Sequence, residues 1–221
     1  MRITYKATCF FFIGASVALA GCASTQPKPY AGIDSSSYLR PNDQARRGHE
    51  PYAYSTNVDW KHYDSFIMDP VAIYRGSDNQ FDTKITEQDR QELASYMQQQ
   101  FQDKLRQRYA LVSTPTSGTL RIRATLTGAK GTTAFLSTFT RMDVGGTPIN
   151  AVQAIRGREG LMTGSVSYAV EVYDASTGRL LKAYVDKQYP NAMNMKATFG
   201  KLGASRRGID KGADGLLAGL Q

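Results

Sequence analysis

The clearest strand pattern in the chain is LRIRATLT, residues 120–127. Apolar and polar positions alternate along it, as they do in a strand that buries one face. The apolar positions are Leu120, Ile122, Ala124 and Leu126. The positions between them are Arg121, Arg123, Thr125 and Thr127. This pattern predicts a half-buried strand with a basic outer face.

Further stretches on both sides predict neighbouring strands. Residues 64–74 are rich in apolar side chains, but Pro70 interrupts them. Because proline cannot donate a ladder hydrogen bond, we expect a bulge or a sheet edge there. A short apolar run at 109–113 predicts one more strand. Residues 165–173 alternate again, a turn follows, and residues 180–189 return, which predicts an antiparallel hairpin.

Two segments have the pattern of helices. Residues 86–109 place apolar side chains at helical spacing, and Thr86 with Asp89 predicts a capping box at the start. The second segment, 201–221, carries a stripe of glycines: Gly208, Gly212, Gly215 and Gly219. Each glycine inside a helix costs about 1 kcal/mol relative to alanine. The stripe therefore indicates either very close packing against another element or a frayed helix, and the sequence supports both interpretations.

These elements predict one α+β domain over residues 60–221. We expect a mixed, mostly antiparallel sheet of four to five strands, with one long helix packed on a face and a C-terminal helix. The order strand, helix, strand near its start fits one crossover connection. Residues 128–163 are rich in Gly and Thr and predict an irregular segment, which is either a functional loop or a mobile one.

The start of the chain has the features of an export signal. A short basic stretch precedes an apolar run at residues 7–20. The run is too short to cross a bilayer core, which needs about 20 residues in a helix. It ends in LAGC, residues 19–22, which resembles the lipobox of bacterial lipoproteins. We therefore expect residues 1–21 to be a lipoprotein signal peptide and Cys22 to be lipidated.

Residues 22–59 are then the lipidated N-terminus and a tether with prolines spaced through it. Its tyrosines are too numerous for a pure linker, so we expect parts of it to lie against the domain. Several acyl chains on Cys22 would give near-permanent attachment to a membrane. Ala23 stands where an inner-membrane protein of some enteric bacteria has Asp, which favours the periplasmic face of the outer membrane.

Cysteine content and charge limit the classes of partner. Removal of the signal peptide takes away Cys9, and lipid occupies Cys22, so no thiol is left for a disulfide. Loss of Arg2 and Lys6 changes the formal charge from +8 to +6. A basic envelope protein can contact anionic head groups, an anionic envelope polymer or a protein partner. The compartment excludes nucleic acid. The candidate contact residues are Arg121, Arg123, Arg156 and Arg158.

Residues that would indicate catalysis are sparse. The two histidines, His49 and His62, have no partner at metal-ligand spacing. The glycine-containing stretch 127–133 lacks the Gly-Lys-Ser/Thr ending of a phosphate loop. We therefore predict no catalytic residues, no metal and no cofactor. A cell-wall hydrolase would need two carboxylates that converge in one cleft.

The order of several short motifs resembles that of a known family. The main one is Trp60-x-x-Tyr63-x-x-x-Ile67-x-x-Pro70-Val71, and the LRIRA of strand 120–127 also matches. These motifs are similar to those of an uncharacterised family of Gram-negative lipoproteins, domain of unknown function 3313. The resemblance implies a lipoprotein context and no established activity.

We therefore expect an outer-membrane lipoprotein that serves as a non-enzymatic accessory or binding module of the cell envelope. Two alternatives remain open. One is a lipid or glycolipid carrier, which needs an apolar cavity beneath residues 128–163. The other is a hydrolase that acts on the cell wall through paired carboxylates.

Overall fold

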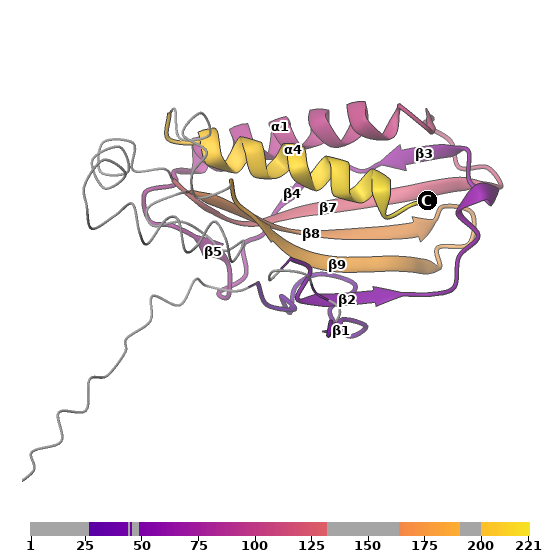
Figure 1. Cartoon of the computed structure of the whole chain (residues 1–221), viewed down its shortest axis with the longest axis horizontal. Helices are drawn as coiled ribbons and strands as arrows, with labels where there is room; N and C mark the ends of the chain where they lie inside the picture. The colour runs from indigo at the N-terminus through magenta and orange to yellow at the C-terminus, as the bar shows by residue number, and fades with distance from the viewer. Residues whose placement is uncertain (1–26, 44, 46–48, 132–163, 191–199) are drawn as a thin grey trace, which may run out of the picture.

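The alternating stretch forms the middle of the longest strand, β7 (Thr119–Lys130). β7 pairs antiparallel with β8 (Ser165–Asp174), and β8 pairs antiparallel with β9 (Leu180–Gln188), so the predicted hairpin is confirmed. The computed structural model describes residues 27–43, 45, 49–131, 164–190 and 200–221. Within these ranges the chain builds one mixed sheet with two helices on one face (Figure 1).

The remaining strands are short. They are β1 (Arg40–Pro41), β2 (Tyr52–Ser55), β3 (Ser65–Met68), β4 (Ala72–Ile73), β5 (Gln80–Phe81) and β6 (Ala110–Leu111). The order across the sheet is β1-β2-β9-β8-β7-β3-β6. β3, β4 and β5 follow one another in parallel along the edge of β7 that β8 does not occupy, and β6 adds parallel to β3.

The predicted fold class is therefore wrong in its sheet and in its helices. The sheet has nine strands in the described part of the chain, not four or five, and both predicted helices cover the same face of it rather than the long helix alone. β1, β4, β5 and β6 have two residues each, which is too short for any alternation to be visible. β2 lies in the stretch whose prolines indicated a tether. The break at Pro70 separates β3 from β4, as expected.

Helices α1 (Glu87–Leu105) and α4 (Gly203–Ala218) lie side by side on the same face of the sheet (Figure 1). α1 begins with the predicted capping box, because the Thr86 side chain accepts from the Asp89 amide and the Asp89 side chain accepts from the Thr86 amide. The apolar sides of α1 and α4 pack against one face of β7, β8 and β9, and the main core lies between them. Fully buried members of this core include Phe66, Leu93, Met97, Phe101, Leu120, Ile122, Leu126, Val166, Tyr168 and Ile209.

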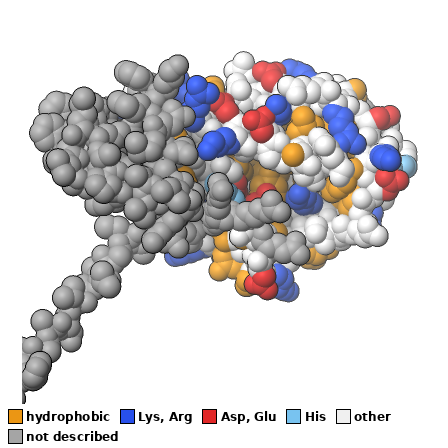
Figure 2. All heavy atoms as spheres, viewed as in Figure 1, with side chains coloured by type: hydrophobic (Ala, Val, Ile, Leu, Met, Phe, Trp, Pro, Cys, Tyr) orange, Lys and Arg blue, Asp and Glu red, His pale blue; other side chains and the backbone are white. Residues whose placement is uncertain are grey.

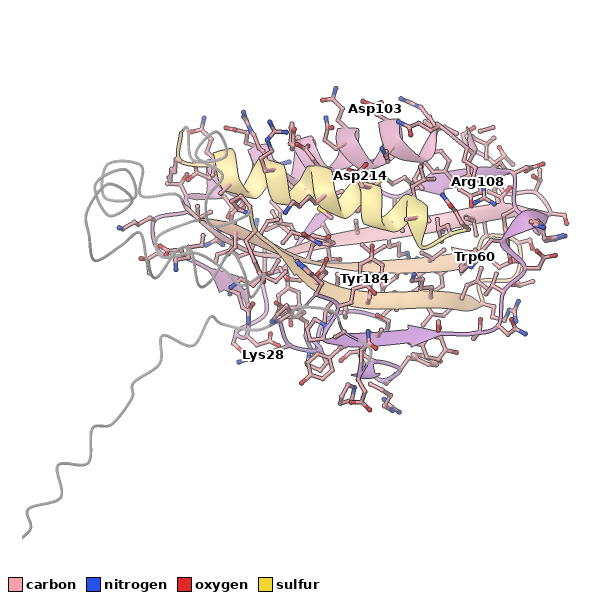
Figure 3. All side chains as sticks on the ribbon, in the orientation of Figure 1. Lys28, Trp60, Asp103, Arg108, Tyr184 and Asp214 are labelled. Atoms are coloured by element: carbon pink, nitrogen blue, oxygen red, sulfur yellow. The ribbon has the colours of Figure 1, made fainter. Side chains whose placement is uncertain are left out.

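The helices run in the same direction and are joined by polar contacts along their length. Lys201 pairs with Asp89 at one end, and at the other the Arg108 guanidinium donates to the Leu220 carbonyl, 2.8 Å away. Figure 3 shows Arg108 beside the carboxyl-terminal end of α4. Acidic and basic side chains are interspersed over this face in the space-filling view (Figure 2).

A short 3-10 turn, η1 (Trp60–His62), leads into β3.

The opposite, outer face of the sheet is partly covered by residues 30–39. Tyr30, Ile33 and Leu39 are buried there against Ala183 and Val185 of β9. The Ser35 amide donates to a carboxylate oxygen of buried Glu171, 2.6 Å away. Residues expected to form a tether therefore pack on the sheet, and β2 extends it by pairing with β9.

Candidate functional site

A groove of about 540 Å³ lies on the outer face of the sheet. It separates the covering segment 30–39 from the turn between β8 and β9. We call it the Arg–Tyr groove. Its lining residues are Asp34, Tyr38, Tyr54, Arg121, Arg123, Tyr173, Asp174, Ala175, Gly178, Arg179 and Leu180.

Two arginines of β7 form the floor of the groove. The period of a strand places Arg121 and Arg123 on the same face, two residues apart. Asp69 follows β3 and lies next to them, because its amide donates to the Ile122 carbonyl of β7, 3.0 Å away. Nε of Arg121 lies 3.0 Å from both carboxylate oxygens of Asp69. Nε of Arg123 lies 3.0 Å from one of them, and its Nη1 lies 2.6 Å from Asp34.

These contacts fix both guanidinium groups. Burial alone would raise the pKa of the Asp69 carboxyl, but the hydrogen bonds and charges of Arg121 and Arg123 outweigh it and hold that pKa below its usual range. The Asp69 carboxylate therefore stays ionised, and it pairs with and orients both guanidinium groups. Their side chains remain 43% and 40% exposed at the groove.

Tyrosine rings form the walls. Tyr38 is 49% exposed, and its ring centroid lies 5.3 Å from that of Tyr54. The guanidinium carbon of Arg123 lies 5.2 Å from the centroid of the Tyr173 ring. Burial, followed by the nearby charges of Glu171 and Asp34, raises the pKa of Tyr173 to about 12. Tyr173 is therefore a neutral phenol at physiological pH.

The turn at the end of the groove is built by Asp174. One carboxylate oxygen accepts from the Ser176 amide and hydroxyl and from the Thr177 amide, and the other accepts from the Tyr63 hydroxyl, 2.9 Å away. Burial acts to raise the pKa of Asp174, but these hydrogen bonds hold it far below its ordinary value. Gly178 completes the turn with a φ of +72°. This turn places Arg179 at the groove.

A second polar cluster lies at the edge of the helix-covered face. The Asp186 side chain is 4% exposed and accepts from the Tyr168 hydroxyl, the Glu50 amide and the Gln188 side chain at 3.0, 3.1 and 2.7 Å. His49 Nδ1 lies 3.4 Å from the same carboxylate. Burial acts to raise the pKa of Asp186, but His49 and the other donors hold it below its usual range. This cluster fastens residues 49–50 to β9.

The structure places the predicted site residues in different surroundings. Arg121 and Arg123 lie together in the groove, but both are already paired with acidic side chains of the same chain. Contact with an anionic partner stays a prediction. The other predicted positions lie outside the described residues: Cys22, Arg156, Arg158 and, beyond residue 131, the irregular segment 128–163.

The glycine-containing stretch after residue 127 is part of the sheet. β7 continues through it to Lys130, and a Cβ at Gly128 would lie 2.6 Å from the Gln80 carbonyl of the neighbouring strand β5. Close approach of two strands therefore accounts for Gly128 without a phosphate.

The glycine stripe of α4 divides into two kinds of position. A Cβ at Gly208 would lie 2.6 Å from Val166 Cγ1, and one at Gly212 would collide with the Tyr168 hydroxyl. A Cβ at Gly215 would meet nothing within 4 Å, whereas one at Gly219 would contact Lys182 Nζ. The first two glycines therefore allow α4 to approach β8 closely.

The sequence did not single out Tyr38, Tyr54, Tyr173 and Arg179 as members of a site. The only signal was the excess of tyrosines before residue 60. Within the described ranges, no three His, Cys, Asp or Glu side chains are placed to hold a metal ion together. None of the described helices has the length and apolar character needed to span a membrane.

The chain belongs to the family described as protein of unknown function, DUF3313, whose pattern matches residues 29–216. The family resemblance inferred from the sequence is thereby confirmed. No curated protein matches the chain.

The solved structures that are similar to this chain have low TM-scores and low sequence identity. They include the PelC dodecamer from Paraburkholderia phytofirmans, with 10% identity, coverage of 68% of this chain and 86% of that one, and a TM-score of 0.35. The hypothetical protein CT253 from Chlamydia trachomatis has 10% identity, coverage of 71% and 97%, and a TM-score of 0.36. A PDZ domain protein from Parabacteroides distasonis has 13% identity, coverage of 69% and 36%, and a TM-score of 0.32.

Proposed function

We propose that this protein is a lipid-anchored, non-enzymatic binding module of the cell envelope, attached through Cys22 to the periplasmic face of the outer membrane. The anchor rests on residues 19–22 of the sequence. The binding role rests on one observation, the Arg–Tyr groove. Its volume lies in the range of ligand sites, about 300–1,000 Å³. Its partner is an envelope protein or an anionic envelope polymer.

The groove supports binding better than acid–base catalysis. Asp34 and Asp174 both line it, so two carboxylates do share one hollow. A glycosidase needs one of its pair to be a proton donor with a raised pKa. The pKa of Asp174 is lowered by its turn hydrogen bonds, and Asp34 is paired with Arg123. The lowered pKa of Asp174 opposes the role of proton donor, and the Asp34 carboxylate is engaged in its ion pair with Arg123.

The alternative of a lipid carrier has less support from the described residues. A lipid chain needs an enclosed apolar cavity, whereas charged side chains line much of this groove. A second hollow, of about 420 Å³, is also lined by charged and hydroxyl side chains, including Lys28, Asp78, Asp82, Ser165 and Ser167.

Photo-crosslinking in living cells tests the binding role. A benzophenone amino acid is placed at Tyr38 in the groove or, as a control, at Leu111 in β6 at the other end of the sheet. Both are exposed large side chains, at 49% and 37%. We expect an adduct from position 38 and none from position 111. No adduct at 38, or the same adduct at both positions, would contradict a binding role for the groove.

The anchor is tested separately by palmitate labelling of Cys22→Ala. We expect the variant to remain unlabelled and to leave the outer-membrane fraction, while its domain keeps the circular dichroism spectrum of the unaltered protein. Normal labelling of the variant would show that Cys22 is not the lipidated residue.

A further inference from the structure

We infer that the ligand of the Arg–Tyr groove is a hydroxyl-rich glycan chain, an inference that rests on the proposed binding function. The charges of the groove give the first reason. Three guanidinium groups, Arg121, Arg123 and Arg179, lie at it. Three carboxylates, those of Asp34, Asp69 and Asp174, lie beside them and pair with groups of the same chain. The formal charge of the set is zero, so a densely charged ligand gains little net attraction there.

The hydrogen-bonding groups of the groove give the second reason. A guanidinium carries five N–H donors in a planar fork. Asp69 accepts from Nε and Nη2 of Arg121, while Asp69 and Asp34 accept from Nε and Nη1 of Arg123. Both forks are thus held rigid while their side chains stay partly exposed. The Asp34 carboxylate beside them is 70% exposed and is an acceptor. Fixed donors next to an exposed acceptor match a hydroxyl group, which both donates and accepts.

The tyrosines give the third reason. A sugar ring has an apolar C–H face as well as its hydroxyls, and it can lie against an aromatic ring whose polar end reaches water. Tyr38 is the most exposed large hydrophobic side chain among the described residues, and it stands at the groove against Tyr54. Tyr173, a neutral phenol, adds a hydroxyl that can donate or accept. Ring faces and fixed polar groups in one open hollow favour a glycan over a lipid or a phosphate.

The test is calorimetric titration of the full-length protein in detergent micelles with three probes. These are a neutral N-acetylglucosamine hexasaccharide, a galacturonate hexasaccharide and inorganic polyphosphate. We expect the neutral hexasaccharide to bind at least as tightly as the galacturonate hexasaccharide, and polyphosphate to bind at least tenfold more weakly than the neutral one. Tyr38→Ala should weaken saccharide binding about tenfold, and Tyr38→Phe should restore most of the affinity because the ring is kept. Leu111→Ala, the control at the opposite end of the sheet, should bind normally.

Three results would overturn the inference. One is polyphosphate binding as tight as that of the saccharides and falling steeply with salt, because that indicates attraction by charge alone. Another is saccharide binding unaffected by Tyr38→Ala, which places the site elsewhere. The third is no saccharide binding at all. If the crosslink from position 38 then captures a protein in cells, the binding function stands and only the glycan is wrong. If that crosslink is also absent, the proposed binding function and the glycan inference both fail.

Discussion

Gly208 and Gly215 of α4 differ in what surrounds them, although both lie on the same predicted stripe. At Gly208 the added Cβ would lie 2.6 Å from the buried Val166 side chain and 3.1 Å from the Gln188 carbonyl. Gly208→Ala should therefore force α4 away from the sheet and lower the free energy of unfolding by about 1–3 kcal/mol.

Gly215→Ala is the matched control, because its Cβ would meet nothing within 4 Å. It should raise the free energy of unfolding by about 0.4–1 kcal/mol through the better helix propensity of alanine. Urea unfolding of both variants measures the difference. Equal effects would mean that α4 does not pack closely on β8.

The Asp186 carboxylate predicts a pH dependence. Its folded-state pKa is lowered, so it contributes stability above its unfolded value, about 3.9, and loses that contribution as pH falls through the folded value. Asp186→Asn should lower the free energy of unfolding at pH 7 by about 1–3 kcal/mol, because buried donors lose their charged acceptor.

The difference between Asp186→Asn and the unaltered protein should be present at pH 5 and should shrink as the pH falls below about 4. Urea unfolding across this range measures it. A difference that grows as the pH falls below about 4 would contradict the lowered pKa of Asp186. Most of this cluster was not foreseeable, since Glu50 and Asp186 are far apart in sequence and nothing in their spacing links them.

At the scale of elements, the pairing of α1 with α4 has two components. Exposed ion pairs such as Arg206 with Glu92 lie on the outside, and buried apolar side chains such as Leu220 lie beneath. Exposed pairs contribute less than about 1 kcal/mol, whereas truncation of a buried leucine costs about 2–5 kcal/mol.

We therefore expect Leu220→Ala to destabilise the protein by at least about 2 kcal/mol and Arg206→Ala by less than about 1 kcal/mol. The Arg206→Ala effect should also diminish at high salt, because screening weakens exposed pairs. Thermal unfolding at low and high salt measures both. A larger loss of stability from Arg206→Ala than from Leu220→Ala would mean that exposed charges, rather than buried apolar contacts, hold α1 against α4.

The longest elements were predictable because each carries its pattern within itself. α1 has a capping box and a full apolar stripe, and β7 and β8 alternate over many residues. The two-residue strands have no such pattern and exist only because β7, β3 or β2 offers them a partner. The basic face of β7 was predicted, but its pairing with Asp69 and Asp34 depends on the packing of distant segments.

At the scale of the whole molecule, residues before Trp60 are part of the folded unit. β2 pairs with β9 over four residue positions, and Tyr30 and Leu39 are buried on the outer face. A chain that begins at Trp60 would lose β2 and the segment that covers the outer face. It would also expose the edge of β9, which favours aggregation.

We therefore expect a chain that begins at Lys28 to melt cooperatively and a chain that begins at Trp60 to melt at a lower temperature or aggregate. Circular dichroism and size-exclusion chromatography compare the two. Equal melting temperatures would show that the sheet is complete without β1 and β2. The Arg–Tyr groove also depends on this segment, which supplies Asp34, Tyr38 and Tyr54.

The packed part of the chain begins close to the proposed anchor, and this limits the distance between the domain and the membrane. Only residues 23–26 separate the proposed anchor Cys22 from Pro27, where the described structure begins. Five residue steps of fully extended chain span at most about 18 Å. Under the proposed anchoring at Cys22, the tether is therefore short and keeps the domain close to the lipid surface. Under that proposal a partner would meet the groove close to the bilayer, because the tether is too short to let the domain cross the periplasm.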